Sequence, residues 1–497
     1  MTLINLPCAS YCTMRMLSVE GLLIGSVDWT WKVKCGWVDG RAMLLQYAKS
    51  LSPAKKHGVV RPGIARVCLI SCAALLNCCA MLLIVRSLGP AAFGRYALVR
   101  WLATVAAPAI GVGMSALTRC SLSEISSRES PRLAAGICYF MWRRHYRKIL
   151  LYCLVYLLLV IPFAKFFGGN APGFLLLVAG LAIPPCLLSR VASITLRSLR
   201  RSDLLVAIQL AGAMVLLLLV IATPDAQLPQ RGSSVAARGA SHPGTGQALG
   251  AAFLLASAAA SLVILILALL CIPRLLPLRD ALTPGTLLKQ RLTRGLHNSL
   301  LLFTLDGIVW QPSELLLLGH WRSAADLGCY ALSFMLSSGF MNIAPTLLFT
   351  CLLPLLLRAM PGQHYMNGTE AWIKLTLYTA LLTLPMCVIA LLCCPALIVL
   401  CFGTSFLPVV TPLRILLISA AFGSVATAST TRLANGNRKQ AQLWPGAAAA
   451  ILNVALALPC IALWGVSGAA FASASAQVLY ATCTILLCGR DMLGRRR

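Results

Sequence analysis

The sequence predicts an all-α membrane protein with about twelve transmembrane helices. Of the 497 residues, 59% are hydrophobic and only 11% are charged, whereas about 25% are charged in an average soluble protein. Apolar runs of about 20 residues recur along most of the chain, and each is long enough to cross a hydrocarbon core of about 30 Å. Because these runs lack the alternation of barrel strands, we expect helices, which pair their own backbone groups in lipid.

Charged, proline and glycine residues separate the apolar runs and set the boundaries of the predicted spans. The predicted spans lie at residues 64–86, 96–118, 147–167, 172–196, 202–222, 248–272, 295–318, 326–349, 372–394, 411–433, 443–462 and 465–488. The longest outward connection lies at about 223–247, is rich in Gly, Ser, Pro and Ala, and is expected to be flexible.

The positions of the basic residues predict how the spans are oriented. The formal net charge is +29, but lysine and arginine concentrate in the even-numbered connections and at the C-terminus. A nucleic-acid-binding protein would instead gather them beside aromatic residues on a folded surface, so we expect no nucleic-acid partner. By the positive-inside rule, the basic connections and both termini are cytoplasmic.

The spans also set the expected domain boundaries. We expect a cytoplasmic N-terminal extension at 1–63, a six-helix lobe at 64–272, a basic cytoplasmic linker at 273–294, a second six-helix lobe at 295–488 and a basic cytoplasmic tail at 489–497. The extension lacks the order of regions in a signal peptide, because Arg15 and Glu20 interrupt its weak apolar stretch.

An internal repeat supports the division into two lobes. Four short strings recur in the same order at nearly constant spacing: FGRYAL at 93–98 with LGCYAL at 327–332, FG at 167–168 with FG at 402–403, TLR at 195–197 with TTR at 430–432, and GAAF at 250–253 with GAAF at 468–471. Because six spans separate equivalent points, the lobes should be related by a pseudo-two-fold axis along the membrane normal. Lobes related in this way leave a central cleft that opens to either side when they rock, as in an alternating-access transporter.

Several strings resemble one family of membrane proteins. RSLGP at 86–90 followed by FGRYAL resembles the first-loop signature of the polysaccharide biosynthesis / O-antigen (lipid-linked oligosaccharide) flippase family. This family belongs to the multidrug/oligosaccharidyl-lipid/polysaccharide exporter superfamily. Further strings resemble its seventh, tenth and twelfth helices: Asp306 through WQPSE at 310–314 to LG at 318–319 and GCY at 328–330, LRIL at 413–416, and WGVSGAA at 464–470.

The resemblance covers about residues 64–490, apart from the connection at about 223–247. One residue departs from the family pattern. Many relatives have a basic residue beside the Ser-Glu pair, where this chain has Pro312. The proline removes a cationic contact there and is expected to bend the helix.

The resemblance implies a flippase that moves a polyprenyl (pyro)phosphate-linked oligosaccharide from the cytoplasmic to the outer leaflet by alternating access. Its product would feed O-antigen (lipopolysaccharide), capsule or exopolysaccharide biosynthesis. The implied location is the inner (cytoplasmic) membrane of a bacterial cell. The implied partners are the lipid-linked oligosaccharide, membrane lipids, and the polysaccharide polymerase and glycosyltransferases of the same pathway.

Two other functions remain open at this stage. A cation-coupled multidrug antiporter of the same superfamily would be expected to carry a carboxylate in the first spans, and residues 64–118 contain none. A membrane-embedded polysaccharide polymerase or ligase would act through basic residues in a large outer loop, such as Arg231, Arg238 and His242. The two-lobe repeat argues against such an enzyme.

An anionic head group needs cations along its path, and ionisable residues inside apolar spans are the candidates. Arg100 lies about one turn inside the outer end of the second span, where it either contacts substrate or snorkels to the interface. Asp306 lies near the middle of the seventh span. There it would pair with Arg100, with Arg414 or with a coupling cation, H⁺ or Na⁺, or form a purely structural ion pair.

Glu314, Arg190 and Arg414 complete the set of candidate substrate-binding and transport residues. Glu314 lies nearer the outer end of the seventh span, where water could hydrate it. Arg190 and Arg414 lie near the ends of their helices, where the orientation of the spans also explains a basic residue.

Signatures of catalysis are missing from the sequence. It has no Gly-rich phosphate loop, no HExxH and no GxSxG. Its 21 cysteines form no CxxC pair, and its six histidines are scattered. We therefore expect no enzymatic activity, no structural metal and no cofactor other than a coupling cation.

Overall fold

The structure is a computed structural model. It describes residues 60–105, 131–166, 173–199, 201–223, 243–277, 309–347, 368–435 and 443–494, together with 281–283, 285, 286, 290 and 305. Every regular element within these residues is a helix, and eight of the helices are long and apolar enough to cross a membrane. The described part of the chain is therefore all-helical, and the chain is a multi-pass membrane protein. Most of the predicted N-terminal extension and most of the connection at 223–247 lie outside the described residues, and α3 begins at Val60, within the predicted extension.

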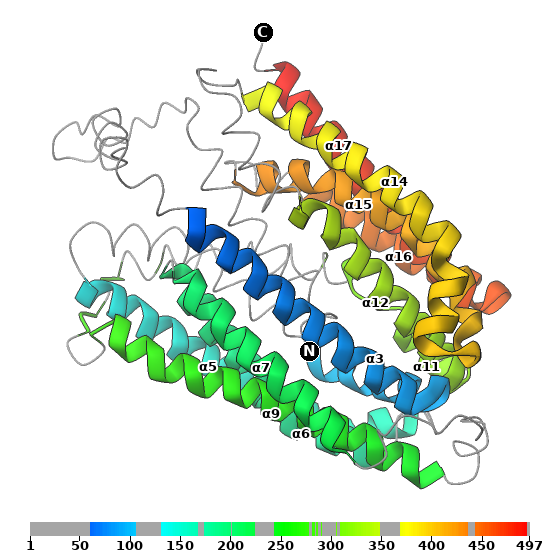
Figure 1. Cartoon of the computed structure of the whole chain (residues 1–497), viewed down its shortest axis with the longest axis horizontal. Coiled ribbons are helices and arrows are strands. Elements are labelled where there is room, and N and C mark those ends of the chain that lie inside the picture. The colour runs from blue at the N-terminus through cyan, green and yellow to red at the C-terminus, as the bar shows by residue number, and fades with distance from the viewer. Residues whose placement is uncertain are drawn as a thin grey trace.

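The helices form two groups (Figure 1). The first group contains α3 (Val60–Thr104), α5 (Pro131–Phe166), α6 (Gly173–Ser198), α7 (Ser202–Ala222) and α9 (Pro243–Leu275). The second group contains α11 (Leu315–Trp321), α12 (Ala324–Leu347), α14 (Gly368–Phe402), the short 3₁₀ helix η6 (Thr404–Val409), α15 (Val410–Asn435), α16 (Leu443–Trp464) and α17 (Val466–Gly494). The main contact between the groups is that of α3 with α12.

Helix α3 is a hairpin with two arms. Gly89 has a φ of 69° and a ψ of 174°, a conformation that glycine adopts without a steric penalty. Pro90 follows it and suits the first turn of the second arm. Nη1 of Arg100 lies 4.0 Å from Sδ of Met81, although nineteen residues of continuous helix would separate them by about 28 Å. The chain therefore reverses at Gly89, between the spans predicted at 64–86 and 96–118.

The second arm of α3 packs against α12, and two glycines make this contact close. A Cβ atom at Gly94 would collide with the backbone of Ala324 and Gly328. A Cβ atom at Gly328 would collide in turn with the backbone of Pro90 and Gly94. Small residues of this kind let membrane helices approach to backbone contact. The strings FGRYAL and LGCYAL thus contain the positions at which the two groups touch.

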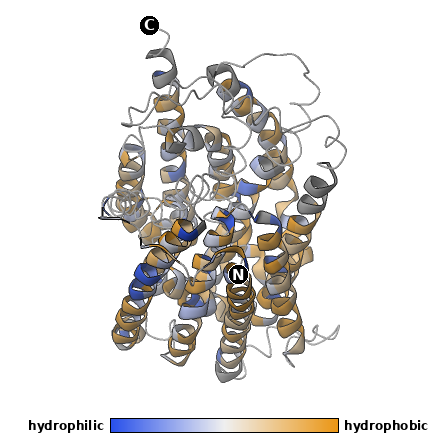
Figure 2. Cartoon of the chain, turned by 90° about the vertical axis from the view of Figure 1, so that its left-hand side faces the viewer, coloured by the Kyte–Doolittle hydropathy of each residue, from blue (hydrophilic) through white to orange (hydrophobic). Residues whose placement is uncertain are grey.

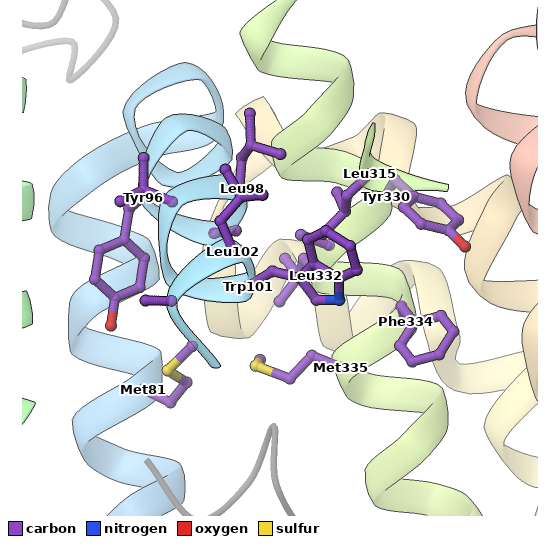
Figure 3. Close-up of a cluster of buried hydrophobic side chains, with 14 of the residues drawn as sticks. Met81, Tyr96, Leu98, Trp101, Leu102, Leu315, Tyr330, Leu332, Phe334 and Met335 are labelled. Carbon is purple, nitrogen blue, oxygen red and sulfur yellow. The ribbon is translucent and has the colours of Figure 1, made fainter. Parts of the chain in front are cut away.

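An apolar core fills the region around this contact (Figure 3). Leu98 and Trp101 of α3 lie in the same cluster as Leu332 and Met335 of α12. A smaller core lies inside the first group, between α6, α7 and α9. Apolar residues also cover most of the helix surfaces (Figure 2), so lipid tails are their expected surroundings.

In each group, one tryptophan forms a hydrogen bond to a neighbouring helix. Nε1 of Trp142 in α5 donates to Oγ1 of Thr195 in α6 at 3.1 Å. Nε1 of Trp372 in α14 donates to Oγ of Ser429 in α15 at 2.9 Å. Thr195 begins the string TLR, and Ser429 directly precedes the matching TTR. The pairs α5–α6 and α14–α15 are therefore joined by the same kind of bond at matching places.

Two of the differences between the helices and the predicted spans concern α5 and the region before α11. Helix α5 begins at Pro131, well before the span predicted at 147–167, because the basic stretch ahead of that span contains no helix-breaking residue after Gly136. Residues 311–314, inside the span predicted at 295–318, are not α-helical, and α11 begins at Leu315. Pro312 lacks the amide hydrogen that a continuous helix needs, so the predicted interruption at this residue is confirmed.

Replacing Gly328 by alanine should weaken the contact between α3 and α12, because the added methyl group overlaps the carbonyl oxygen of Pro90. Overpacking of this kind costs about 1–3 kcal/mol. Gly328→Ala should therefore lower the melting temperature of the purified protein in detergent. Gly339→Ala in the same helix is the matched control, since a Cβ there meets no atom within 4 Å. Equal melting temperatures for the two variants would contradict the close contact.

Candidate functional site

A buried arginine lies in the second arm of α3. Only 5% of the surface of Arg100 is exposed. Its Nη1 donates a hydrogen bond to Oη of Tyr96, one turn earlier, at 2.9 Å, and its guanidinium carbon lies 5.8 Å from the centroid of the Tyr96 ring. Nη2 is buried without a hydrogen-bond partner among the described residues. Arg100 therefore points into the protein and does not snorkel to the membrane surface.

A second arginine approaches the same region from α6. Arg190 is partly buried, and its Nη2 also lacks a hydrogen-bond partner among the described residues. Both Arg190 and Arg100 lie close enough to the buried Cys186, one turn before Arg190, to interact with its thiol electrostatically. A buried polar nitrogen without a hydrogen bond is unfavourable, and Nη2 of each arginine is such a nitrogen among the described residues.

Glu314 lies in the second group, at the start of α11. Only 2% of its surface is exposed, so bulk water does not hydrate it. Oη of Tyr330 donates to its Oε2 at 2.7 Å. Oε1 is buried without a hydrogen bond of normal geometry from a described residue, although Asn453 of α16 and Ser473 of α17 lie beside the carboxyl group. Glu314 thus sits in a polar pocket of neutral side chains.

Matching tyrosines hold these two charged groups. Tyr96 and Tyr330 occupy the same place in the strings FGRYAL and LGCYAL, and both are fully buried. Tyr96 accepts a hydrogen bond from a cation, whereas Tyr330 donates one to a carboxyl group. The matching positions therefore hold a guanidinium in the first group and a carboxyl group in the second.

Among the remaining sequence candidates, Arg414 does not join either cluster. Arg414 is exposed on α15, where it lies near Cys394 of α14. Asp306 lies outside the described residues, so its pairing with Arg100, Arg414 or a cation stays a prediction. Within the described part of the chain, no group of three or more His, Cys, Asp or Glu side chains could hold a metal ion.

A further contact joins the two groups at the ends of α5 and α11. The imidazole of His320 stacks on the ring of Phe166, with centroids 4.4 Å apart and planes 12° apart. Its Nδ1 lies 3.1 Å from the carbonyl oxygen of Phe166. By the predicted orientation, Phe166 and His320 lie at the outer ends of their spans, as do Gly94 and Gly328.

This arrangement of helices is similar in fold to solved structures of transporters. The lipid II flippase MurJ in an inward closed conformation superposes with a TM-score of 0.57 at 10% sequence identity, over 84% of this chain and 87% of that one. An inward-facing multidrug resistance transporter of the MATE family gives a TM-score of 0.56 at 13% identity, over 87% and 98%.

A MOP superfamily transporter from Pyrococcus furiosus, whose binding pocket has reversed polarity, gives a TM-score of 0.55 at 13% identity, over 88% and 96%. No protein-family profile matches the sequence, and no curated protein matches it. The likeness thus extends to lipid flippases and to drug transporters, and it concerns the fold.

Removing the hydroxyl of Tyr330 should destabilise the second group, because Oε2 of Glu314 then loses its donor. A buried group left without its hydrogen bond costs about 1–3 kcal/mol. Tyr330→Phe and Glu314→Ala should each lower the free energy of unfolding, and the double variant should lower it by less than their sum, as a double-mutant cycle measures. Additive losses would contradict the hydrogen bond.

Proposed function

We propose that this protein is a flippase that moves a polyprenyl (pyro)phosphate-linked oligosaccharide from the cytoplasmic to the outer leaflet of a bacterial inner membrane. The proposal rests on Arg100 and Arg190, which both lie near the thiol of Cys186. Arg100 and Arg190 each keep a buried guanidinium nitrogen without a described hydrogen-bond partner. A (pyro)phosphate accepts hydrogen bonds from guanidinium groups in a matching planar geometry.

The alternative function is a cation-coupled multidrug antiporter. The fold serves both classes, since flippase and MATE structures superpose equally well. Two features of this chain favour an anionic substrate. The spans predicted at 64–86 and 96–118 contain no carboxylate, and the buried charge in the described part of α3 is positive. A membrane polymerase or ligase has less support, because the fold is that of transporters.

The proposed cycle moves two six-helix lobes against each other. The matching Trp–hydroxyl bonds and the contact of Gly94 with Gly328 support a two-fold relation between the lobes. The contacts at Gly94–Gly328 and at Phe166–His320 lie at the predicted outer ends of the spans. The described conformation is therefore assigned to the inward-facing state, in which the head group enters from the cytoplasm. Breaking both contacts would open the outer side.

Glu314 is the proposed site of energy coupling. Its carboxyl group is buried among Tyr330, Asn453 and Ser473, and an isolated carboxylate is costly in such surroundings. Uptake of H⁺, or of Na⁺ by the oxygens around it, would neutralise the charge. Asp306 is a second proposed coupling group. The proposed partners are the polymerase and glycosyltransferases that use and supply the lipid-linked oligosaccharide.

Arg100→Ala should abolish most of the movement of a lipid-linked oligosaccharide across proteoliposome membranes. A hydrogen bond to a charged group contributes about 1.5–3 kcal/mol, which corresponds to roughly 10- to 100-fold in rate if it is made in the transition state. The measurement is the accessibility of the sugar to an impermeant reagent over time. Arg414→Ala is the comparison, since it removes an exposed guanidinium and should have a smaller effect.

A protein that moves no sugar lipid but drives cation-dependent dye efflux would instead be the antiporter. Equal losses in Arg100→Ala and Arg414→Ala would argue against a special role for the buried arginine.

A metal bridge between α5 and α11 should stop transport if the two groups of helices must separate at their outer ends. Phe166→His places a second imidazole against His320, whose ring lies 4.4 Å from that of Phe166, and two imidazoles at this spacing bind Zn²⁺. Zn²⁺ should inhibit translocation by Phe166→His, and EDTA should restore it. The wild type and Phe166→His/His320→Ala, with at most one imidazole here, should keep their activity. Full activity of zinc-bound Phe166→His would refute opening at this contact.

A further inference from the structure

Helix α5 carries a dense group of basic side chains ahead of its apolar part. Arg143, Arg144, Arg147 and Lys148 lie within two turns. Arg143 and Arg147 are exposed, and they occupy positions i and i+4 on one face of the helix. None of these residues is needed for the proposed passage of the sugar lipid.

These basic groups repel one another. Arg143 with Arg147, and Arg144 with Lys148, are like-charged pairs at i and i+4, a spacing that destabilises a helix, and Arg144 acts unfavourably on the ammonium group of Lys148. No acidic side chain occurs anywhere in α5. The helix therefore presents a concentrated positive charge that its own residues do not compensate.

The length of the apolar stretch places this charge at a membrane surface. The chain from Lys148 to Lys165 contains no other charged residue, and at 1.5 Å per residue it is about 25 Å long. A hydrocarbon core is about 30 Å thick, so the two lysines mark its boundaries. Tyr139 and Tyr146 are 62% and 55% exposed beside the arginines, as is typical of aromatic residues at the level of the head groups.

The basic face continues directly into a lipid-facing one. Leu150, Leu154 and Leu158 follow Arg147 at spacings that keep them on the same side of α5, and they are 59%, 55% and 68% exposed. A ligand that fits this surface needs an anionic head and a long apolar tail. A soluble anion would leave the leucines uncovered.

We propose that Arg143 and Arg147 form a binding site for an anionic phospholipid of the surrounding bilayer. The lipid phosphate lies between the two guanidinium groups, Tyr139 and Tyr146 flank the head group, and the acyl chains run along Leu150 and Leu154. The site is separate from Arg100 and Arg190, and it does not depend on which substrate the protein moves.

The test is lipid binding by the purified full-length protein. Phosphatidylglycerol and, separately, phosphatidylcholine are titrated into the protein in neutral detergent, and bound lipid is counted by native mass spectrometry. Two basic groups near a surface strengthen the binding of an anionic lipid by roughly 30-fold. Arg143→Gln/Arg147→Gln should weaken phosphatidylglycerol binding by about this factor, and phosphatidylcholine binding should not change.

Arg86→Gln/Lys165→Gln is the matched control, because it removes two exposed but isolated basic groups and should leave phosphatidylglycerol binding nearly unchanged. Arg143→Lys/Arg147→Lys keeps the charge and should retain most of the binding, which also shows that replacing these residues leaves the fold intact. Equal weakening in the Gln variant and its control would overturn the proposal, because net charge alone would then explain it. Competition by soluble glycerol phosphate at the same concentration as the lipid would also overturn it, in favour of a site for free anions.

Discussion

The backbone of α3 touches the backbone of α12 at Gly94 and Gly328, and much of the molecule is arranged around this contact. Lipid offers no hydrophobic driving force between helices, so close van der Waals contact between small residues has to hold them together. With the two glycines fixed against each other, Tyr96 and Tyr330, each two residues further on, are fixed as well. The hydroxyl groups that hold Arg100 and Glu314 are thus positioned by the same contact that joins the two groups of helices.

This arrangement places a different kind of ionisable side chain beside the tyrosine of each group. In the first group a guanidinium lies against a tyrosine, with a second arginine nearby. In the second group a carboxyl group lies against a tyrosine, among neutral polar side chains. A low dielectric strengthens the field of each charge. A buried guanidinium and a buried carboxyl group thus lie in different groups of helices, each beside its own tyrosine.

Hydropathy was sufficient to predict most of the helices and the reversal at Gly89, because a span is a property of about 20 neighbouring residues. The repeated strings FGRYAL and LGCYAL contain Gly94 and Gly328, the two residues that meet in the structure. Local patterns could not reveal which side chains surround a charge. Arg190 and Cys186 reach Arg100 from another helix, and Asn453 and Ser473 reach Glu314 from two others. The alternative that water hydrates Glu314 is wrong for this reason, since its burial depends on α12, α16 and α17. The Tyr96–Arg100 pair lies within one helix, at the i and i+4 spacing of neighbouring side chains.

Trp142 and Trp372 each link two helices through one hydrogen bond from the indole to a hydroxyl group. Bonds between membrane helices contribute only about 0.6 kcal/mol on average, which is close to the thermal energy at room temperature. A hydrogen bond of this strength favours one register of the two helices, but it breaks and re-forms spontaneously. Each bond therefore favours one register of α5 against α6, or of α14 against α15, and packing along the helices contributes the rest of their association.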